Sequence, residues 1–203
     1  MSGPPPCPVS YGPAMAELVL FHHAQGLTTG VVAFADTLRD AGHLVHTPDL
    51  FGGRTFPDIA SGVAHAEEIG FETIIERGTE SVADLPAALV YAGFSLGVLP
   101  AQGLAQTRPG ARGALLYSAT VPTSAFGAPW PEDVPVQVHL MDEDEWAEED
   151  LEAARALERE ADGAEVFVYP GSAHLFADAS LPDYRPDAAG LLMQRTLEFL
   201  ARL

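Results

Sequence analysis

Short apolar segments alternate with helical segments along most of this chain. Six apolar segments have the length and composition of strands, namely residues 17–22, 43–47, 88–92, 113–117, 136–141 and 166–169. Helical spacing of apolar residues is found between them, at residues 29–41, 58–85, 96–106, 147–161 and 186–203. Alternating strands and helices form a parallel sheet, because each helix carries the chain back before the next strand begins. The pattern predicts an α/β fold with about six mostly parallel strands and helices on both faces.

The composition supports a single domain over residues 15–203. Hydrophobic residues make up 47% of the 203 residues and charged residues 19%, which is enough apolar material for one core. Residues 1–14 (MSGPPPCPVSYGPA) are rich in proline and lack the features of a signal peptide, so we expect them to form a disordered extension. Within that extension Cys7 is the one cysteine of the chain, which excludes an internal disulfide and favours a cytoplasmic location.

The charge balance excludes several classes of partner and mechanism. Ten basic and 29 acidic residues give a net charge of −19, which argues against binding to nucleic acid or to an anionic membrane surface. All ten basic residues are arginine, so a lysine Schiff base is excluded. No apolar run approaches the length of a membrane span. The expected partner is therefore a small molecule.

A nucleophile motif follows the third predicted strand. Gly93-Phe94-Ser95-Leu96-Gly97 has the form G-x-S-x-G, and it lies between an apolar strand and a helix. In this context the serine occupies a sharp turn at the carboxyl edge of the sheet, where the start of the following helix can stabilise an oxyanion. Ser95 is therefore the candidate nucleophile.

A serine nucleophile needs a histidine base and an acid that orients it, in the chain order serine, acid, histidine. Two histidines follow Ser95. His139 lies inside an apolar strand and is expected to be a core residue, whereas His174 lies in a loop after the last strand and is the candidate base. The acid should follow the preceding strand, where Asp144 is preferred to Asp142 because Asp142 is too close to the strand end.

At this point the chain resembles the dienelactone hydrolase family of α/β-hydrolases. The similar segments are LVLFHHAQGL, FADTLRDAGHLVHTPDLF, YAGFSLG, VHLMDEDEW and YPGSAHLFA, and the likeness runs from Glu17 to Leu203. The resemblance implies a minimal α/β-hydrolase fold and a catalytic triad that falls on Ser95, Asp144 and His174. It also implies that the N–H groups of Leu96 and Ala24 bind the oxyanion.

Four positions depart from the family pattern. Ser95 stands where the founding members have cysteine, His23 where they have an activating glutamate, and Ala173 where they have glycine. Asp178 stands where they have an arginine that binds the substrate carboxylate. We therefore expect a serine enzyme that prefers neutral substrates, because a carboxylate would meet Asp178 instead of a cation.

Several further residues are candidates for the substrate pocket, each with a plain structural alternative. The aromatic candidates lie at strand ends or beside triad positions, namely Phe94, Tyr117, Trp146 and Phe176. Packing in the hydrophobic core explains an aromatic residue at each of these positions nearly as well. His23 and Arg54 are the polar candidates, and an ordinary loop arginine is the alternative for Arg54. His22 is expected to be structural. Four further acidic residues after the fifth strand are expected to form a solvated face, namely Glu148, Glu149, Asp150 and Glu152.

The sequence thus predicts a hydrolase that cleaves an ester, lactone or thioester through an acyl-enzyme on Ser95, without a metal or organic cofactor. One alternative is a catalytically silent protein that kept the fold and binds a small ligand. A second is a metal-dependent hydrolase with His22, His23, Asp144 and His174 as ligands, which is disfavoured because these residues lack zinc-type spacing.

Overall fold

Residues 15–203 contain one sheet of six parallel strands, as expected. The computed structural model describes residues 15–203, so the extension predicted at residues 1–14 lies outside the described residues. The strands are β1 (Glu17–Phe21), β2 (Leu44–His46), β3 (Val90–Phe94), β4 (Gly113–Tyr117), β5 (Val136–Met141) and β6 (Ala164–Tyr169). Their spatial order is β2-β1-β3-β4-β5-β6, and every neighbouring pair is parallel. All carboxyl ends therefore meet at one edge of the sheet.

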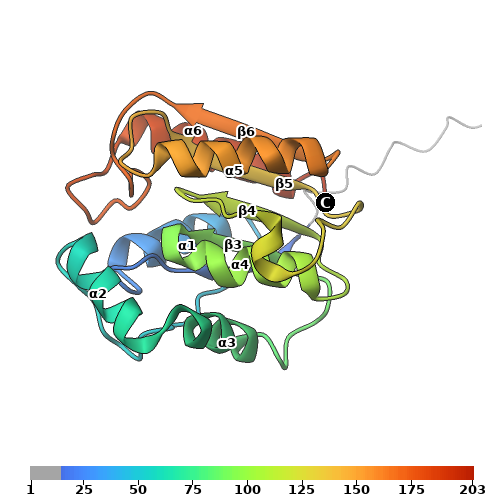
Figure 1. Ribbon diagram of the computed structural model, residues 1–203, viewed down its shortest axis with the longest axis horizontal. Helices are drawn as coiled ribbons and strands as arrows, with labels where there is room; N and C mark the ends of the chain where they lie inside the picture. The colour runs from blue at the N-terminus through green and yellow to red at the C-terminus, as the bar shows by residue number, and fades with distance from the viewer. Residues whose placement is uncertain (1–14) are drawn as a thin grey trace, which may run out of the picture.

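Helices cover both faces of this sheet, which confirms the predicted layering. The helices are α1 (Thr29–Asp40), α2 (Ile59–Ile69), α3 (Phe71–Ser81), α4 (Val98–Thr107), α5 (Ala147–Glu160) and α6 (Pro186–Leu200), with short 3₁₀ turns η1 (Ser95–Gly97) and η2 (Thr123–Phe126). Figure 1 shows α5 in front of the sheet and α6 behind it. The core on one face is built with α1 and α6, and the core on the other face with α3, α4 and α5.

The central strands are buried on both faces. Every residue of β3 and β4 is buried, and so are the last four residues of β1. Strands covered on both sides become continuous apolar runs, because neither face meets water. This is why the sequence locates them so clearly.

One strand boundary differs from the prediction in a way that affects the site. β3 ends at Phe94, two residues beyond the predicted end at residue 92. Gly93 and Phe94 therefore belong to the strand and pair with Leu116 and Tyr117 of β4. Ser95 follows the strand directly, with no intervening loop.

The long helical segment at residues 58–85 contains one break, at Gly70. Gly70 has a φ of +90°, a conformation that favours glycine, and it separates α2 from α3. From its glycines, the sequence predicts breaks in this segment near both Gly70 and Gly78; the break at Gly78 is wrong, because Gly78 lies within α3. A Cβ at position 78 would lie 2.4 Å from the Cβ of Pro100, so this glycine lets α3 approach α4 closely.

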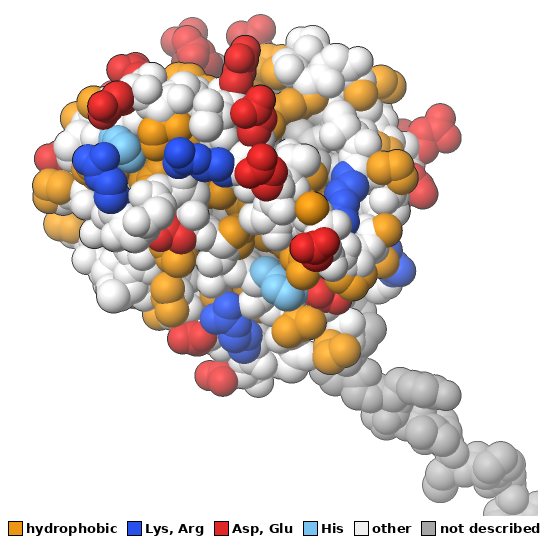
Figure 2. Space-filling view, turned by 90° about the horizontal axis from the view of Figure 1, so that it is seen from below, with side chains coloured by type: hydrophobic (Ala, Val, Ile, Leu, Met, Phe, Trp, Pro, Cys, Tyr) orange, Lys and Arg blue, Asp and Glu red, His pale blue; other side chains and the backbone are white. Residues whose placement is uncertain are grey.

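Acidic and arginine side chains are interspersed with apolar ones on the face of the described chain shown in Figure 2. Charges of both signs therefore alternate on that face, and they do not form a continuous basic surface there. Within residues 15–203, no helix combines the length and the apolar character needed to cross a membrane.

Candidate active site

Ser95 occupies a strained turn between β3 and the helical segment η1–α4. Its φ is +47°, in the left-handed region that residues other than glycine rarely adopt. The two glycines of the motif make this turn possible. A Cβ at Gly93 would lie 2.2 Å from the carbonyl oxygen of Gly97, and a Cβ at Gly97 would lie 2.6 Å from that of Phe21. Strand, turn and helix can pack this closely only because both positions lack a side chain.

The structure brings Ser95, His174 and Asp144 together. The Ser95 hydroxyl lies 2.7 Å from His174 Nε2, and His174 Nδ1 lies 2.5 Å from Asp144 Oδ2. Since the carboxylate can only accept, Nδ1–H donates to Asp144 and leaves Nε2 as the acceptor for the Ser95 hydroxyl. The side chains of His174 and Asp144 are buried, and Ser95 is half-buried. This arrangement can remove the serine proton and stabilise the resulting imidazolium.

Asp144, and not Asp142, contacts His174. Asp142 directly follows β5 and is exposed, and its Oδ1 accepts a hydrogen bond of 2.9 Å from Gly171 N–H. Asp144 Oδ1 accepts from Trp146 N–H at 3.3 Å, which leaves Oδ2 for the histidine. Within the same loop, Asp142 thus binds the backbone of Gly171, whereas Asp144 binds the His174 ring.

The two segments expected to supply the oxyanion N–H groups lie at the same edge of the sheet. β1 and β3 pair with Phe21 opposite Gly93, so the chain leaves both strands side by side. Leu96 lies in the first helical turn, where backbone N–H groups have no partner within the helix. Ala24 is buried in the segment that follows β1. Both residues therefore lie in segments that follow neighbouring strands, at the edge of the sheet that carries Ser95.

A cavity of about 390 Å³ opens beside His174 and Asp144. Its wall is formed by residues from α2 and from the loops after β5 and β6, namely Ile59, Ala60, Val63, Asp144, Glu145, Trp146, Ser172, His174 and Asp183. Trp146, one of the predicted pocket residues, lines it with its ring centroid 4.4 Å from that of His174. Ile59, Ala60 and Val63 were missed, because nothing in the sequence places α2 opposite His174.

Three aromatic residues expected in the pocket lie in the core instead. Phe94, Tyr117 and Phe176 are almost completely buried on the α1 and α6 side of the sheet. The Phe94 ring packs against Tyr117 at 4.7 Å between centroids, and the Tyr117 hydroxyl forms a 3.0 Å hydrogen bond with Thr196. The prediction is wrong for these residues because Phe94 in β3, Tyr117 in β4 and Phe176 in the segment after β6 all pack into the core on the α1 and α6 side of the sheet.

The two polar pocket candidates also lie elsewhere. His23 is completely buried, and its Nε2 donates to Asp178 Oδ2 at 2.8 Å. Arg54 is exposed, donates to His65 Nδ1 at 3.3 Å, and has its guanidinium 5.3 Å from the centre of the Phe56 ring. Neither residue lines the cavity beside His174.

Asp178 does not face a substrate carboxylate. It is 2% exposed and accepts hydrogen bonds from His23, Thr28 and Ser180. The expectation that a carboxylate substrate would meet this side chain is therefore wrong. A preference for neutral substrates would need a physical basis other than Asp178.

His22 and His139 are structural, as expected. His22 Nε2 accepts from Leu50 N–H at 3.0 Å while Nδ1–H donates to the carbonyl of His23, and burial lowers the pKa of His22 to about 4. His139 is buried between Tyr169 and Gln137, and burial, with a smaller contribution from Arg195, lowers its pKa to about 3. Both rings are neutral hydrogen-bonding groups near pH 7.

Asp150 does not belong to a solvated face. It lies in the first turn of α5, is 9% exposed, and its Oδ1 accepts from Thr120 N–H at 2.8 Å. Burial raises the pKa of Asp150 to about 6, while Thr120 and His174 act in the opposite direction and Asp144 and Glu149 add to the increase. A second carboxyl group is thus electrostatically coupled to the His174–Asp144 pair.

Ser118 is a further residue that sequence reasoning missed. It follows β4 as Ser95 follows β3, and it too has a positive φ, of 60°. Its hydroxyl oxygen is buried and has no hydrogen-bond partner among the described residues. The signal in the sequence was its position directly after a buried strand at the carboxyl edge of the sheet.

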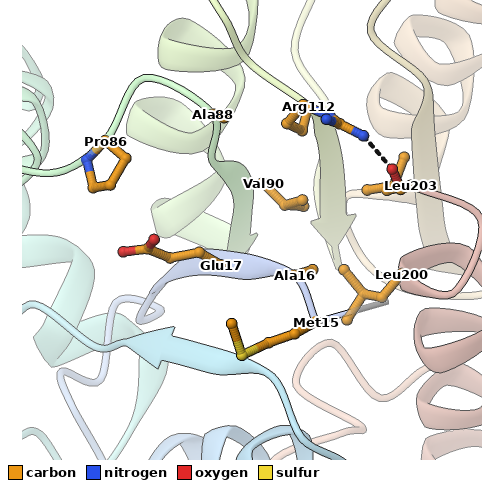
Figure 3. Close-up of a pocket in the computed structure, with 9 residues that line it drawn as sticks. All are labelled: Met15, Ala16, Glu17, Pro86, Ala88, Val90, Arg112, Leu200 and Leu203. Carbon is orange, nitrogen blue, oxygen red and sulfur yellow. Dashed lines mark hydrogen bonds between the residues drawn. The ribbon is translucent and has the colours of Figure 1, made fainter. Parts of the chain in front are cut away.

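A different cavity, of about 310 Å³, lies at the opposite edge of the sheet. Figure 3 shows its mainly apolar wall, with Arg112 donating to the carbonyl oxygen of Leu203. Val90, which begins β3, is part of this wall, whereas Ser95 follows the other end of the same strand. The cavity is therefore remote from the Ser95 site.

Within residues 15–203, no three His, Cys, Asp or Glu side chains gather in a way that could hold a metal ion.

Comparisons with known proteins show the family to which the chain belongs. The family model described as the dienelactone hydrolase family matches residues 9–203. No curated protein sequence matches the chain. Among solved structures, a protein of Klebsiella pneumoniae subsp. pneumoniae assigned as a dienelactone hydrolase has a TM-score of 0.71 at 19% identity, covering 97% of this chain and 90% of its own.

Two structures from metagenomic libraries are also similar. A dienelactone hydrolase-like promiscuous phosphotriesterase has a TM-score of 0.74 at 18% identity, covering 96% of this chain and 88% of its own. A cold-adapted esterase from an Arctic intertidal metagenomic library has a TM-score of 0.67 at 16% identity, covering 93% of this chain and 83% of its own. These likenesses show a shared α/β-hydrolase fold, and the family model covers nearly the whole sequence. The chain belongs to the dienelactone hydrolase family.

Proposed function

We propose that this protein hydrolyses small neutral carboxylic esters, including lactones and thioesters, through an acyl-enzyme on Ser95. The observation that carries the proposal is the 2.7 Å contact between the Ser95 hydroxyl and His174 Nε2, continued by the 2.5 Å contact between His174 Nδ1 and Asp144. The family is one of carboxylesterase-like hydrolases, and similar folds include one named as an esterase and one named as a phosphotriesterase.

Acylation begins when His174 Nε2 takes the proton of the Ser95 hydroxyl as Oγ attacks the carbonyl carbon. The carbonyl π electrons move to its oxygen, and the backbone N–H groups of Leu96 and Ala24 stabilise this oxyanion. Collapse of the tetrahedral intermediate breaks the bond to the alcohol or thiol. The imidazolium of His174 gives its proton to that leaving group.

Deacylation repeats the sequence with water as the nucleophile. His174 removes a proton from water, the hydroxide attacks the acyl carbon, and the proton returns to Ser95 Oγ as the carboxylic acid leaves. Asp144 keeps the Nδ1 proton of His174 in place and stabilises the positive charge on the ring. The steps balance with water as the only co-reactant.

The cavity beside His174 supports neutral substrates of modest size. Ile59, Val63 and Trp146 supply apolar surface, and the charged residues in its wall other than the triad are the acidic Glu145 and Asp183. A substrate carboxylate would approach these like charges, which costs binding energy, whereas a neutral acyl or alkoxy group would bury apolar area. At about 390 Å³ the cavity has the volume of a small-ligand site.

The test is hydrolysis of a panel of p-nitrophenyl esters of increasing acyl length, together with lactones and acyl thioesters. We expect turnover of short neutral members, unaffected by a chelator, and a loss of about 10⁴-fold in kcat for Ser95→Ala. Full activity of Ser95→Ala would contradict the acyl-enzyme. Binding without any turnover by the wild-type protein would identify a silent ligand-binding protein, and loss of activity with a chelator would identify a metal-dependent hydrolase.

A further inference from the structure

A second buried histidine–aspartate pair joins the segments that follow β1 and β6. His23 and Asp178 come from segments far apart in the chain, since His23 follows β1 and Asp178 lies four residues after His174. His23 Nε2–H donates to Asp178 Oδ2 at 2.8 Å, and both side chains are at least 98% buried. Gln25 N–H donates to His23 Nδ1 at 3.2 Å, which makes Nδ1 an acceptor and puts the ring proton on Nε2.

Asp178 is surrounded by hydrogen-bond donors. Oδ2 also accepts from the Thr28 hydroxyl, while Oδ1 accepts from Ser180 N–H at 2.8 Å and from the Ser180 hydroxyl at 2.6 Å. Four donors thus converge on two oxygens, and an ionised carboxyl group is the side chain that accepts from all of them. Burial alone would raise the pKa of Asp178, but the hydrogen bonds from His23, Ser180 and Thr28 lower it to about 2.

The fold leaves space for this carboxylate at one position in α1. A Cβ at Gly30 would lie 1.6 Å from Asp178 Oδ1 and 2.4 Å from its Cγ. Thr28, which donates to Asp178, is the N-cap of α1 and accepts from Val31 N–H. The carboxylate therefore joins the start of α1, the segment after β1 and the segment after β6.

Between His23 and Thr28 lies Ala24, whose N–H is assigned to the oxyanion under the proposed function. The same segment is held on its other side by two hydrogen bonds between Gln25 and Phe56, and by the close approach of Gly62 in α2 to the Ala24 carbonyl. On the side that faces Asp178, the segment is held by the hydrogen bond from the ring of His23, the residue that precedes Ala24. The direction of the Ala24 N–H thus depends on where that ring is held.

We propose that Asp178 and His23 are positioning residues that set the Ala24 N–H for oxyanion stabilisation, with Asp178 fixing the segment after β1 to the segment that carries His174. This inference rests on the proposed function and adds to it a specific determinant of transition-state binding. Neither residue touches the reacting atoms.

The first variant is Asp178→Asn, whose amide must turn an NH₂ donor toward other donors. The second is Gly30→Ala, which keeps every charge and removes the space for Asp178 Oδ1 although alanine favours helix. We expect both to lower kcat about 10- to 100-fold with KM nearly unchanged, because misplacing one oxyanion donor weakens transition-state binding selectively. His23→Gln keeps an N–H donor toward Asp178 and should retain kcat within about fivefold.

Two controls separate positioning from general loss of structure. Trp130→Phe removes a buried hydrogen bond to the carbonyl of Val134 ahead of β5, at the other end of the strands, and should lower Tm without changing kcat. Ester and thionoester substrates of one structure provide the second control, because a thionoester places sulfur in the oxyanion site and uses its N–H donors poorly. For Asp178→Asn the ratio of ester to thionoester kcat/KM should fall, and the loss should be constant from pH 5 to 9, where this carboxylate is ionised.

Three outcomes would overturn the inference while leaving the proposed function intact. The first is a lower Tm with unchanged kcat, as expected for Trp130→Phe, which would make the pair merely structural. The second is an equal loss for ester and thionoester, which would place the defect at His174. The third is wild-type kcat in His23→Ala, which would show that the contact between His23 and Asp178 does not set the Ala24 N–H. An inactive wild-type protein would instead contradict the proposed function.

Discussion

Ser95 and Ser118 are neighbours at the carboxyl edge of the sheet, and both have a positive φ. They follow the paired residues Phe94 and Tyr117 of β3 and β4, with φ values of 47° and 60°. Within the described chain they are the two residues other than glycine with this conformation. Ser95 has a clear reason for its strain, since the turn presents its hydroxyl to His174. The Ser118 hydroxyl has no hydrogen-bond partner among the described residues. Relief of the backbone strain at Ser118 can therefore be tested by measuring the free energy of unfolding.

Ser118→Gly should stabilise the fold. The left-handed conformation costs a side-chain-bearing residue about 1–2 kcal/mol, whereas the added freedom of glycine in the unfolded chain costs about 0.4–1 kcal/mol. Removal of a buried hydroxyl without a described partner adds to the gain. We expect an increase in unfolding free energy of about 1 kcal/mol, measured by urea denaturation. An unchanged or lower stability would show that the serine side chain makes a compensating interaction.

Asp144→Asn and Asp142→Asn form a matched pair that tests the acid of the triad. Asp144 contacts His174 Nδ1, so an amide there favours the wrong tautomer and should lower kcat by about 10³- to 10⁴-fold. Asp142 is exposed and accepts only from Gly171 N–H, a bond that an asparagine oxygen can keep. We expect its kcat to stay within about threefold of wild type. The reverse ranking would move the acid to Asp142.

Asp150→Asn should stabilise the protein at neutral pH. The raised pKa of Asp150, about 6, means that the folded chain holds this proton more tightly than the unfolded chain does. The stability of the wild-type protein therefore falls as pH rises from about 4 to 6, and the full cost is present above pH 6. Asparagine can still accept from Thr120 N–H and carries no charge, so it should add up to about 2 kcal/mol at pH 7.5.

This prediction is checked by measuring the free energy of unfolding of the wild-type protein and of Asp150→Asn from pH 4 to pH 7.5. The difference between Asp150→Asn and wild type should be near zero at pH 4 and grow to its full value by pH 7. A constant difference across the range would show that Asp150 titrates normally. Glu152→Gln, an exposed position on the same helix, serves as a control with no expected pH-dependent difference.

Substrate charge should matter at the rim of the cavity. A neutral ester should have a higher kcat/KM than a carboxylate analogue of matched size and leaving group, because Glu145 and Asp183 repel the added charge. Salt should narrow the gap by screening the long-range part of this repulsion. Glu145→Gln with Asp183→Asn should narrow it further at low salt. A preference for the carboxylate analogue at low salt would show that a cation, with Arg54 as the first candidate, approaches the bound substrate.

The sequence predicted the sheet well because burial on both faces leaves an unmistakable pattern. β4 and β5 have the predicted boundaries, since each is a fully buried run ended by polar or glycine-rich segments. Ser95, His174 and Asp144 could be chosen from chain order and position after strands, and these are the residues that the structure brings into contact. Such rules identify what lies at the carboxyl edge of a parallel sheet.

The surroundings of the candidate catalytic residues were harder to predict from the sequence. Whether Phe94 faces a pocket or a helix depends on the packing of α1, and whether Asp150 meets water depends on how the segment after β4 folds over it. Asp178 was expected to face substrate, but its partners His23 and Thr28 are close to it in space only after β1 and β6 have joined the same sheet. Contacts between loops depend on the complete topology, and the local sequence pattern does not contain them.

The central claim is that Ser95 is an activated nucleophile, and covalent labelling tests it most directly. The native protein is treated with a fluorophosphonate, its intact mass is measured, and the adduct is located by peptide mapping. We predict one adduct per chain, on Ser95, with no adduct in Ser95→Ala and much slower labelling in His174→Ala. Absence of labelling in the wild-type protein, or an adduct on another residue such as Ser118, would contradict the account.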